Sequence, residues 1–390
     1  MSWEYKTLDQ LGEVSRGRSK HRPRNDSSLF GGEYPFIQTA DVKAANFYIT
    51  EYDTTYNEKG LAQSKLWHPG TLCITIAANI ADTGILAMDA CFPDSVMGFI
   101  PYDEVADVRF VKYCFDILQQ NCKKISQGAA QDNLSWEKLS TILFPAPPVA
   151  VQKKIADILS TFDDLIENNQ KQITLLEEAA QRLYKEWFVE LRFPGHENTP
   201  IVDGVPERWS VQCLSDFANV IMGQSPKSEF YNQEKNGLPF HQGVGSYGTR
   251  FVNDNTYSTS YTRIAEAGSI LFSVRAPVGR LNMTKNKIVI GRGLAAMNHK
   301  CGMQSYLYYL LKERFFKDDI LGNGSIFASI SKDELLSQKF TIPTDALIEQ
   351  FNSITSRIDK KIANLADQVV LLTETRDRLL PKLMNGEIEV

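Results

Sequence analysis

Five cationic side chains lie within one nine-residue segment near the start of the chain. The segment RGRSKHRPR spans residues 16–24 and contains Arg16, Arg18, Lys20, Arg22 and Arg24. Its Gly and Pro residues favour an extended loop, and closely spaced cations on such a loop suit a phosphate backbone. We call these five residues the cationic run, and we predict that it contacts nucleic acid. The alternative is a solvated loop without a partner.

Further basic residues lie later in the chain among Gly, Ser, Asn and Gln. Arg and Lys side chains bond phosphate oxygens and guanine edges, whereas Gln and Asn bond adenine edges. These residue types therefore predict a second DNA contact, although any one of them is more often an ordinary surface residue. The predicted DNA-contacting residues of this region are Lys227, Arg250, Arg275, Arg280 and Arg292.

Motifs that would let the chain perform catalysis are missing from the sequence. It contains no G-x-x-x-x-G-K-[ST] phosphate loop, no H-E-x-x-H, no G-x-S-x-G and no (Asp/Asn)-Pro-Pro-Tyr segment. Its six cysteines lack the spacing of zinc ligands. The carboxylate pair Asp163-Asp164 falls in a helical pattern, where we interpret it as part of a solvated face. These absences predict a binding module that holds no metal or cofactor of its own.

Composition predicts a cytoplasmic protein of two or three domains. The chain has 390 residues, of which 43% are hydrophobic and 23% charged, and no segment approaches the roughly 20 apolar residues of a membrane span. The first residues show neither a basic leader nor an apolar signal core. The net charge is −5, but Lys and Arg outnumber Asp and Glu between residues 200 and 340. DNA contact is therefore expected to be local.

An internal repeat divides the chain into the order A, B, A′, B′. Block B begins near Gly128 and block B′ near Gly324, and 17 of the 61 residue pairs from these positions onward are identical at an offset of 196. Repeats of this kind indicate duplicated structural units. Block A returns at an offset of 206, where Trp3, Leu8, Val14, Gly17 and Ser19 recur as Trp209, Leu214, Val220, Gly223 and Ser225.

Both B blocks show apolar residues in alternating steps of four and three, which is typical of a coiled-coil seam. Arg376 interrupts the second seam. Two separate core helices are the alternative, but the shared frame favours a helix pair within one chain. The first seam is about 50 Å long at roughly 1.5 Å per residue. The predicted seam residues are Ile155, Leu159, Phe162, Ile166, Ile173, Leu176, Leu183 and Trp187, with Phe351, Ile358, Ile362, Leu365, Val369, Leu372, Leu379 and Leu383.

Blocks A and A′ contain short β-branched and aromatic runs, such as residues 71–76 and 269–274, separated by Gly, Pro, Asn and Asp. They predict sheet-containing domains, so the fold class is α+β. Proline precedes each long helix, and Pro381 and Gly386 indicate the end of the second one. The expected boundaries are 1–148 for the first domain, 149–192 for the first helix, 193–342 for the second domain and 343–390 for the second helix.

In combination these features resemble the specificity subunits of type I restriction-modification systems, over essentially the whole chain. The matching phrases are GGEYPFIQTADV at 31–42, Gly128 followed by Leu134-Ser135, a proline-led helix, and LLPKLMNGEI at 379–388. The resemblance implies two target-recognition domains separated by an antiparallel coiled coil, arranged as a pseudo-twofold repeat that reads a bipartite target in double-stranded DNA.

The resemblance also implies partners. Two modification subunits would carry S-adenosylmethionine and methylate adenine, and restriction subunits would use ATP and Mg²⁺ for translocation and cleavage. Gln38 and Gln242 occupy matching positions followed by different residues, as expected of base-reading positions in domains that read different half-sites. Two alternatives remain: the specificity part of a self-sufficient methyltransferase-endonuclease, and a coiled-coil scaffold without DNA function.

Overall fold

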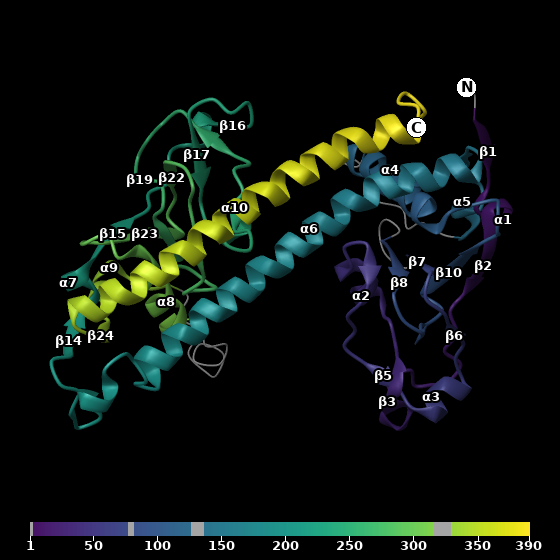
Figure 1. Ribbon diagram of the computed structural model, residues 1–390. Helices are drawn as coiled ribbons and strands as arrows, with labels where there is room; N and C mark the ends of the chain where they lie inside the picture. Colours follow the sequence, from purple (N-terminus) through teal and green to yellow (C-terminus); the bar gives the residue numbers. More distant parts are fainter. Residues whose placement is uncertain (1–2, 77–81, 126–135, 316–328) are drawn as a thin grey trace. The chain divides into compact units, whose positions relative to one another are not determined.

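The computed structural model describes residues 3–76, 82–125, 136–315 and 329–390, with the side chains of 120–125 excepted. Internal contacts divide the chain into two compact units (Figure 1). Unit 1 contains Met1–Lys171 and Leu365–Val390, and unit 2 contains Gln172–Asn364. Gly128 and Leu134-Ser135 lie outside the described residues. No described helix combines the length and apolar composition needed to cross a membrane.

Unit 1 is built on a five-stranded sheet in the order β2-β10-β7-β8-β4, in which only the β4–β8 pair is parallel. The strand β7 is buried along its whole length, as its sequence LCIT requires. The strands of unit 1 are β1 (Glu4–Lys6), β2 (Gly12–Arg16), β3 (Phe30–Pro35), β4 (Tyr48–Ile49), β5 (Thr55–Tyr56), β6 (Leu66–Trp67), β7 (Leu72–Thr75), β8 (Thr83–Leu86), β9 (Ala90–Cys91), β10 (Val96–Pro101) and β11 (Phe144–Ala146).

One main core of unit 1 lies between this sheet and the helices. Ile74 and Phe99 of the sheet belong to the same buried cluster as Phe110 of α4, Leu159 of α6 and Leu383 of α10. Burying such side chains stabilises each by about 1.5–3 kcal/mol relative to exposure. The helices that begin in this unit are α1 (Leu8–Leu11), η1 (Ser27–Leu29), α2 (Thr39–Ala44), α3 (Glu58–Ala62), α4 (Val108–Ile125), α5 (Trp136–Leu139) and α6 (Val149–Tyr184).

Unit 2 contains a four-stranded sheet in the order β15-β23-β20-β21 and a five-stranded sheet in the order β16-β18-β17-β22-β19, besides the two-stranded pairs β12-β13 and β14-β24. Its main core joins Phe272 and Met297 of the first sheet to Tyr306 of α8, Tyr184 of α6 and Phe351 of α10. The strands are β12 (Ile201–Val202), β13 (Val205–Pro206), β14 (Ser210–Cys213), β15 (Ala218–Met222), β16 (Tyr231–Asn232), β17 (Leu238–His241), β18 (Tyr257–Ser258), β19 (Ile264–Ala265), β20 (Ile270–Ser273), β21 (Leu281–Met283), β22 (Ile288–Ile290), β23 (Leu294–His299) and β24 (Lys339–Ile342). The helices are η2 (Lys185–Val189), η3 (His196–Asn198), α7 (Leu214–Phe217), η4 (Ser228–Phe230), η5 (Val244–Ser246), α8 (Gln304–Phe315), α9 (Lys332–Leu336) and α10 (Asp345–Met384).

The units share a pattern of strand pairing that follows the sequence repeat. In unit 1, β1 pairs with β11 so that Lys6 lies opposite Phe144, and in unit 2, β14 pairs with β24 so that Gln212 lies opposite Phe340. These two pairs are related by the same offsets, 206 and 196. The antiparallel order β2-β10-β7-β8 likewise matches β15-β23-β20-β21.

The two long helices run antiparallel within each unit. In unit 1, Asp163 of α6 pairs with Arg376 of α10, and Asn169 bonds Gln368, so the numbering rises along one helix as it falls along the other. In unit 2, Tyr184 contacts Phe351 with ring centroids 5.8 Å apart. All the predicted seam residues are buried or half-buried, and none is exposed.

Proline residues lie just before the start of both long helices and near the end of the second one. α6 begins directly after Pro148, and α10 begins two residues after Pro343. Pro381 lies inside the last turn of α10, which ends at Met384, between the two residues, Pro381 and Gly386, that the sequence marks as the end of the helix. Gly386 follows the helix with a φ of 73°, a left-handed conformation that favours glycine.

Candidate nucleic-acid interface

The cationic run forms an outward-facing ridge in unit 1. It continues from β2 as an extended segment, and side chains on such a segment alternate between its two faces. All five cations of the run are exposed, whereas the intervening Gly17 and Ser19 are buried and His21 is half-buried. Alternate residues on an extended chain lie about 7 Å apart. The sequence therefore places Arg16, Arg18 and Lys20 on one face at a regular spacing, before the chain bends at residues 21–23 and turns at residues 24–25.

Backbone hydrogen bonds hold this ridge against the loop before β10. The Gly17 N–H donates to the Val96 carbonyl at 2.8 Å, and the Arg18 N–H donates to the Phe92 carbonyl at 3.0 Å. The Ser64 hydroxyl donates to the Arg18 carbonyl at 2.7 Å. A Cβ atom at Gly17 would lie 2.3 Å from the Pro93 carbonyl oxygen, so glycine is required for this close approach.

The cations of the run differ in how far they are already paired. Arg24 forms a bidentate contact with Asp94 at 2.7 and 2.8 Å, and Arg22 donates to the backbone carbonyls of Ser19 and His21. In the described part of the chain, no acidic group pairs with the remaining three cations, which are Arg16, Arg18 and Lys20. These three are the strongest candidates for phosphate contacts.

Two polar side chains border the cations of the ridge: His21, within the same segment, and Gln38, beside it. The Ser28 N–H and the His21 ring lower the pKa of Asp26 to about 2, so this carboxylate is ionised and holds the loop after the run. Gln38 is exposed at the N-terminus of α2. Its neighbour Ile37 donates to the Cys91 carbonyl at 2.8 Å, next to the Phe92 carbonyl that anchors the ridge. Gln38 and the cationic run therefore border the same loop.

In unit 2 an equivalent arrangement surrounds the turn Gly291–Gly293. The Gln224 N–H donates to the Ile290 carbonyl at 2.9 Å, as Arg18 does to Phe92 in unit 1. The Gly293 N–H donates to the Gln242 carbonyl at 3.1 Å, and the Arg292 N–H donates to the Ser225 hydroxyl at 3.2 Å. The structure therefore brings two predicted residues, Gln242 and Arg292, together with the loop that precedes Lys227. Both side chains are exposed.

The other predicted residues of unit 2 lie near this turn, with one exception. Arg275 is exposed directly after Val274, whose N–H donates to the Gly293 carbonyl at 2.9 Å. Arg280 is also exposed, and its N–H bonds the Ser273 hydroxyl. Lys227 is exposed and lies 3.8 Å from Glu229. The exception is Arg250.

Arg250 is buried, which does not fit the prediction that it contacts DNA at the surface. Its side chain is 1% exposed and pairs with Asp359 at 2.8 Å. A charge this far from solvent is tolerated because it is neutralised within the protein. We therefore leave Arg250 out of the candidate interface.

The prediction that Asp163-Asp164 forms a solvated face was also wrong for Asp163. Its side chain is 11% exposed, pairs with Arg376, and accepts the Tyr113 hydroxyl at 2.5 Å. Burial, followed by the Asp163 charge, raises the pKa of Tyr113, so the tyrosine stays protonated and donates. Arg376, which interrupts the apolar seam, thus has a carboxylate partner.

Sequence reasoning missed three residues at these interfaces. Lys65 lies 3.7 Å above the Trp67 ring and 3.4 Å from the Ser15 hydroxyl of β2, which places a further cation beside the ridge. Asp94 neutralises Arg24, and Ser225 anchors the turn at Arg292. Only Ser225 had a signal in the sequence, because it repeats Ser19 at the offset of 206.

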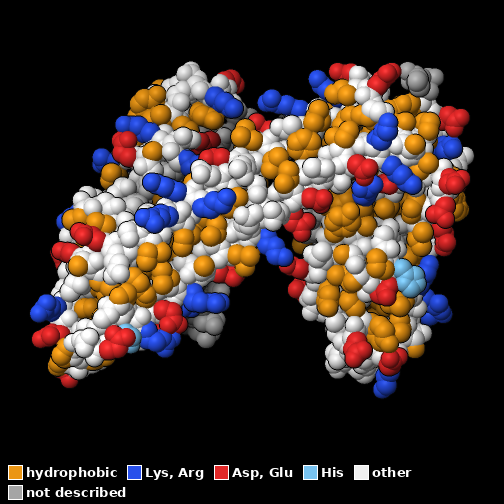
Figure 2. Space-filling model, viewed as in Figure 1, with side chains coloured by type: hydrophobic (Ala, Val, Ile, Leu, Met, Phe, Trp, Pro, Cys, Tyr) orange, Lys and Arg blue, Asp and Glu red, His pale blue; other side chains and the backbone are white. Residues whose placement is uncertain are grey.

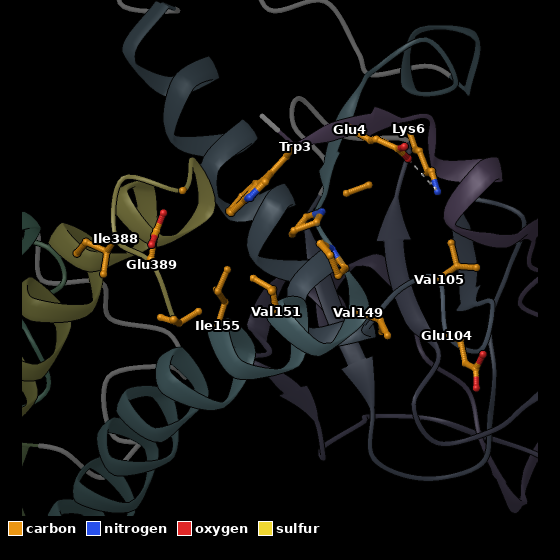
Figure 3. A pocket seen from close by; sticks show the side chains of 15 residues that line it. Trp3, Glu4, Lys6, Glu104, Val105, Val149, Val151, Ile155, Ile388 and Glu389 are labelled. Atoms are coloured by element: carbon orange, nitrogen blue, oxygen red, sulfur yellow. Dashed lines mark ion pairs between the residues drawn. The ribbon is translucent and has the colours of Figure 1, made fainter. Parts of the chain in front are cut away.

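A cavity of about 750 Å³ in unit 1 offers no catalytic constellation (Figure 3). Apolar residues such as Trp3, Val151 and Ile155 line much of it. The carboxylates of Glu104 and Glu389 lie on opposite sides, so they do not converge on one point. Among the described residues, no group of His, Cys, Asp and Glu side chains has an arrangement that would hold a metal ion.

Surface charge is mixed rather than of one sign. Figure 2 shows Lys and Arg side chains interspersed with Asp and Glu over both units on the face in view. This pattern agrees with the net charge of −5. Any attraction to a polyanion therefore depends on local groups such as the cationic run.

Comparison with known proteins decides the family. The model of the type I restriction modification DNA specificity domain matches residues 1–178 and again residues 206–377. The chain belongs to the type I restriction-modification DNA specificity family. The two matches to one domain model correspond to the repeated blocks of the sequence and account for most of the chain.

Relatives in this specificity family align along nearly the full length. The type I restriction enzyme MjaIX specificity subunit of Methanocaldococcus jannaschii is 26% identical, covering 100% of this chain and 94% of the relative. The HindI specificity subunit of Haemophilus influenzae is 23% identical, covering 97% and 98%. The crystal structure of a type I S subunit from M. genitalium has a TM-score of 0.62 at 17% identity and covers 98% of this chain and 96% of that one. This last similarity shows that the fold is shared.

Proposed function

We propose that this DNA-recognition subunit reads a bipartite target, one half-site with each unit, and holds its modification and restriction partners in register. The observation that carries the proposal is the equivalent placement of predicted DNA-contacting groups in both units. In unit 1 the cationic run and Gln38 border the loop before β10. In unit 2, Gln242 and Arg292 border the matching turn before β23.

Phosphate contacts and base contacts would divide between these groups. Cations at a regular spacing on an extended ridge suit a phosphate backbone, which fixes register without reading sequence. Exposed Gln and Arg side chains provide the bidentate contacts that distinguish adenine and guanine in the major groove. Gln38, Gln242 and Arg292 are therefore our candidates for base reading.

The long helices would act as the spacer between the half-sites. We propose that α6 and α10 form one antiparallel coiled coil, related by a pseudo-twofold axis to match opposite DNA strands. The domain boundaries would be 1–148, 149–192, 193–342 and 343–390. Support comes from the antiparallel contacts within each unit and from the burial of the predicted seam. A rod of about 50 Å would separate half-site centres by roughly one and a half DNA turns.

A specificity subunit supplies recognition, so the chemistry would belong to its partners. We propose two modification subunits that use S-adenosylmethionine for N6-adenine methylation, and restriction subunits that use ATP and Mg²⁺. The complex would work in the cytoplasm. The family match favours neither a self-sufficient methyltransferase-endonuclease nor a scaffold without DNA function.

Methylome sequencing tests the proposal directly. A strain that expresses this chain with its modification subunits should acquire N6-methyladenine within one bipartite motif that has a fixed spacer. Omitting this chain should abolish the methylation, and Gln242→Ala should relax one half-site only. Methylation without the chain, or a motif in one continuous block, would contradict the proposal.

A further inference from the structure

The loop between β17 and β18 in unit 2 is fixed to the helices by Arg250. We propose that Arg250 is a positioning residue: it sets the conformation of this recognition loop, and through it the placement of Gln242, by tying the loop to α6 and α10. The inference rests on the proposed function, because it assumes that Gln242 reads DNA. It also gives the buried arginine a specific role.

The guanidinium of Arg250 has contacts that only a planar cation makes. One terminal nitrogen lies 2.8 Å from the Asp359 carboxylate of α10, and the other lies 3.6 Å from the Glu177 carboxylate of α6. The guanidinium carbon lies 3.4 Å above the centre of the Tyr308 ring. Arginine stacks and pairs in this way, whereas the point charge of lysine does not.

The two carboxylates belong to a network built on the helices. Asp359 also accepts the Tyr309 hydroxyl at 2.9 Å and the Ser305 hydroxyl at 2.5 Å, both from α8. Glu177 also pairs with Lys312 of α8 at 3.4 Å. Arg250 is therefore the group through which the recognition loop joins a network otherwise made of helical residues.

The base of the same loop is closed by His241. One ring nitrogen lies 2.8 Å from the Ser246 hydroxyl, and the other lies 2.9 Å from the Asp254 carboxylate. This set resembles a hydrolytic triad, but the imidazole is fully buried and the Ser246 hydroxyl donates to the Gly243 carbonyl. It therefore acts as a clamp, and Gln242 leaves it as the next, exposed residue.

Unit 1 contains a matched cluster that lacks this connection. Asp163 and Tyr113 are the repeat partners of Asp359 and Tyr309 at the offset of 196, and they form the same hydroxyl-to-carboxylate bond. The arginine that forms an ion pair with Asp163 is Arg376, and it belongs to α10 rather than to a recognition loop. The chain thus provides its own control, because Arg376 supports a helix contact and Arg250 connects a loop to the helices.

The test measures discrimination at each half-site separately. The chain is assembled with its modification subunits, and methyl transfer is measured on the cognate duplex and on duplexes with one base pair changed in either half-site. A single mismatch costs about 1–3 kcal/mol, which is roughly five-fold to 150-fold. Gln242→Ala identifies the half-site that unit 2 reads. The test variant is Arg250→Lys, which keeps the charge, and the control is Arg376→Lys.

We expect Arg250→Lys to lose ten-fold or more of the discrimination at the half-site marked by Gln242→Ala. It should retain discrimination at the other half-site within two-fold, and Arg376→Lys should retain both. If thermal unfolding shows that Arg250→Lys is not folded, the double variant Arg250→Met/Asp359→Asn takes its place. It removes both charges of the pair and must give the same loss of discrimination at one half-site only.

Two results would overturn the inference. If a folded Arg250 variant discriminated as well as the wild type at both half-sites, Arg250 would have no positioning role. An equal loss of discrimination at both half-sites would show that Arg250 only stabilises the fold in general. A wild-type complex without discrimination at either half-site would instead refute the proposed function, and the inference with it.

Discussion

Replacing Arg16, Arg18 and Lys20 with alanine removes the three cations of the ridge that have no acidic partner in the described part of the chain. Each phosphate contact contributes about 0.9 to the slope of log K against log salt, so three contacts contribute about 2.7. Between 50 and 200 mM salt, one contact changes affinity about 3.5-fold and three change it about 40-fold. Between 50 and 200 mM salt, the affinity of the wild type should therefore fall by a factor about 40 times larger than the affinity of the triple variant.

Fluorescence anisotropy with cognate and unrelated duplexes, at four or more salt concentrations, measures this slope on the assembled complex. The weakening should be equal for both duplexes, because phosphate contacts carry no sequence information. The matched control is the double variant Arg24→Ala/Asp94→Ala, which removes an existing ion pair at constant net charge and should leave the slope unchanged. An unchanged slope in the triple variant would show that the ridge is a solvated loop.

Three further outcomes are expected. Inserting four residues after Pro148 should extend the helix by about one turn, roughly 6 Å, and lengthen the spacer in the methylome motif by one or two base pairs with both half-sites intact. An unchanged spacer would contradict the proposal that the long helices set the distance between the half-sites. Burial opposes ionisation of Asp254, but hydrogen bonds from His241 and Asn286 hold its pKa below the ordinary value of 3.8, so its stabilisation is present above that pH and lost as the pH falls through the lower pKa of the folded state. The urea midpoints for unfolding of the wild type and of Asp254→Asn should therefore converge in acid. A difference that stays constant with pH would show that ionised Asp254 does not stabilise the fold. The purified chain alone should transfer no labelled methyl group from S-adenosylmethionine to DNA, and incorporation above a no-protein blank would contradict its role as a recognition subunit.

Local patterns predicted the elements of the fold well. The steps of four and three place Ile155 and Leu159 on one helix face, and that face is buried in the structure whatever the helix packs against. Buried strands such as β7 were visible because β-branched and apolar residues follow one another between turn residues. These patterns depend on neighbours in the sequence, so a single chain reveals them.

The roles of individual charges were not predictable in the same way. Arg250 and Arg292 have the same side chain and similar sequence surroundings, yet one is buried and the other exposed. The difference arises from Asp359, which lies 109 residues after Arg250 and meets it only in the folded chain. Asp163 was misjudged for the same reason, since Arg376 lies 213 residues away.

The split of the Arg250 network between loop and helices limits how this chain can exchange parts with its relatives. A recombination that replaced residues 193–342, the proposed second domain, would remove Arg250 and Lys312 but leave Glu177 and Asp359 behind on α6 and α10. Unless the incoming domain brought an arginine to the same place, the two carboxylates would lose the cation between them, at a cost of about 3–5 kcal/mol for breaking a buried pair. Replacement of this part of unit 2 therefore requires a donor with a compatible arginine. In unit 1, by contrast, Asp163 of α6 takes its arginine from α10, so replacing the residues before α6 carries no such requirement.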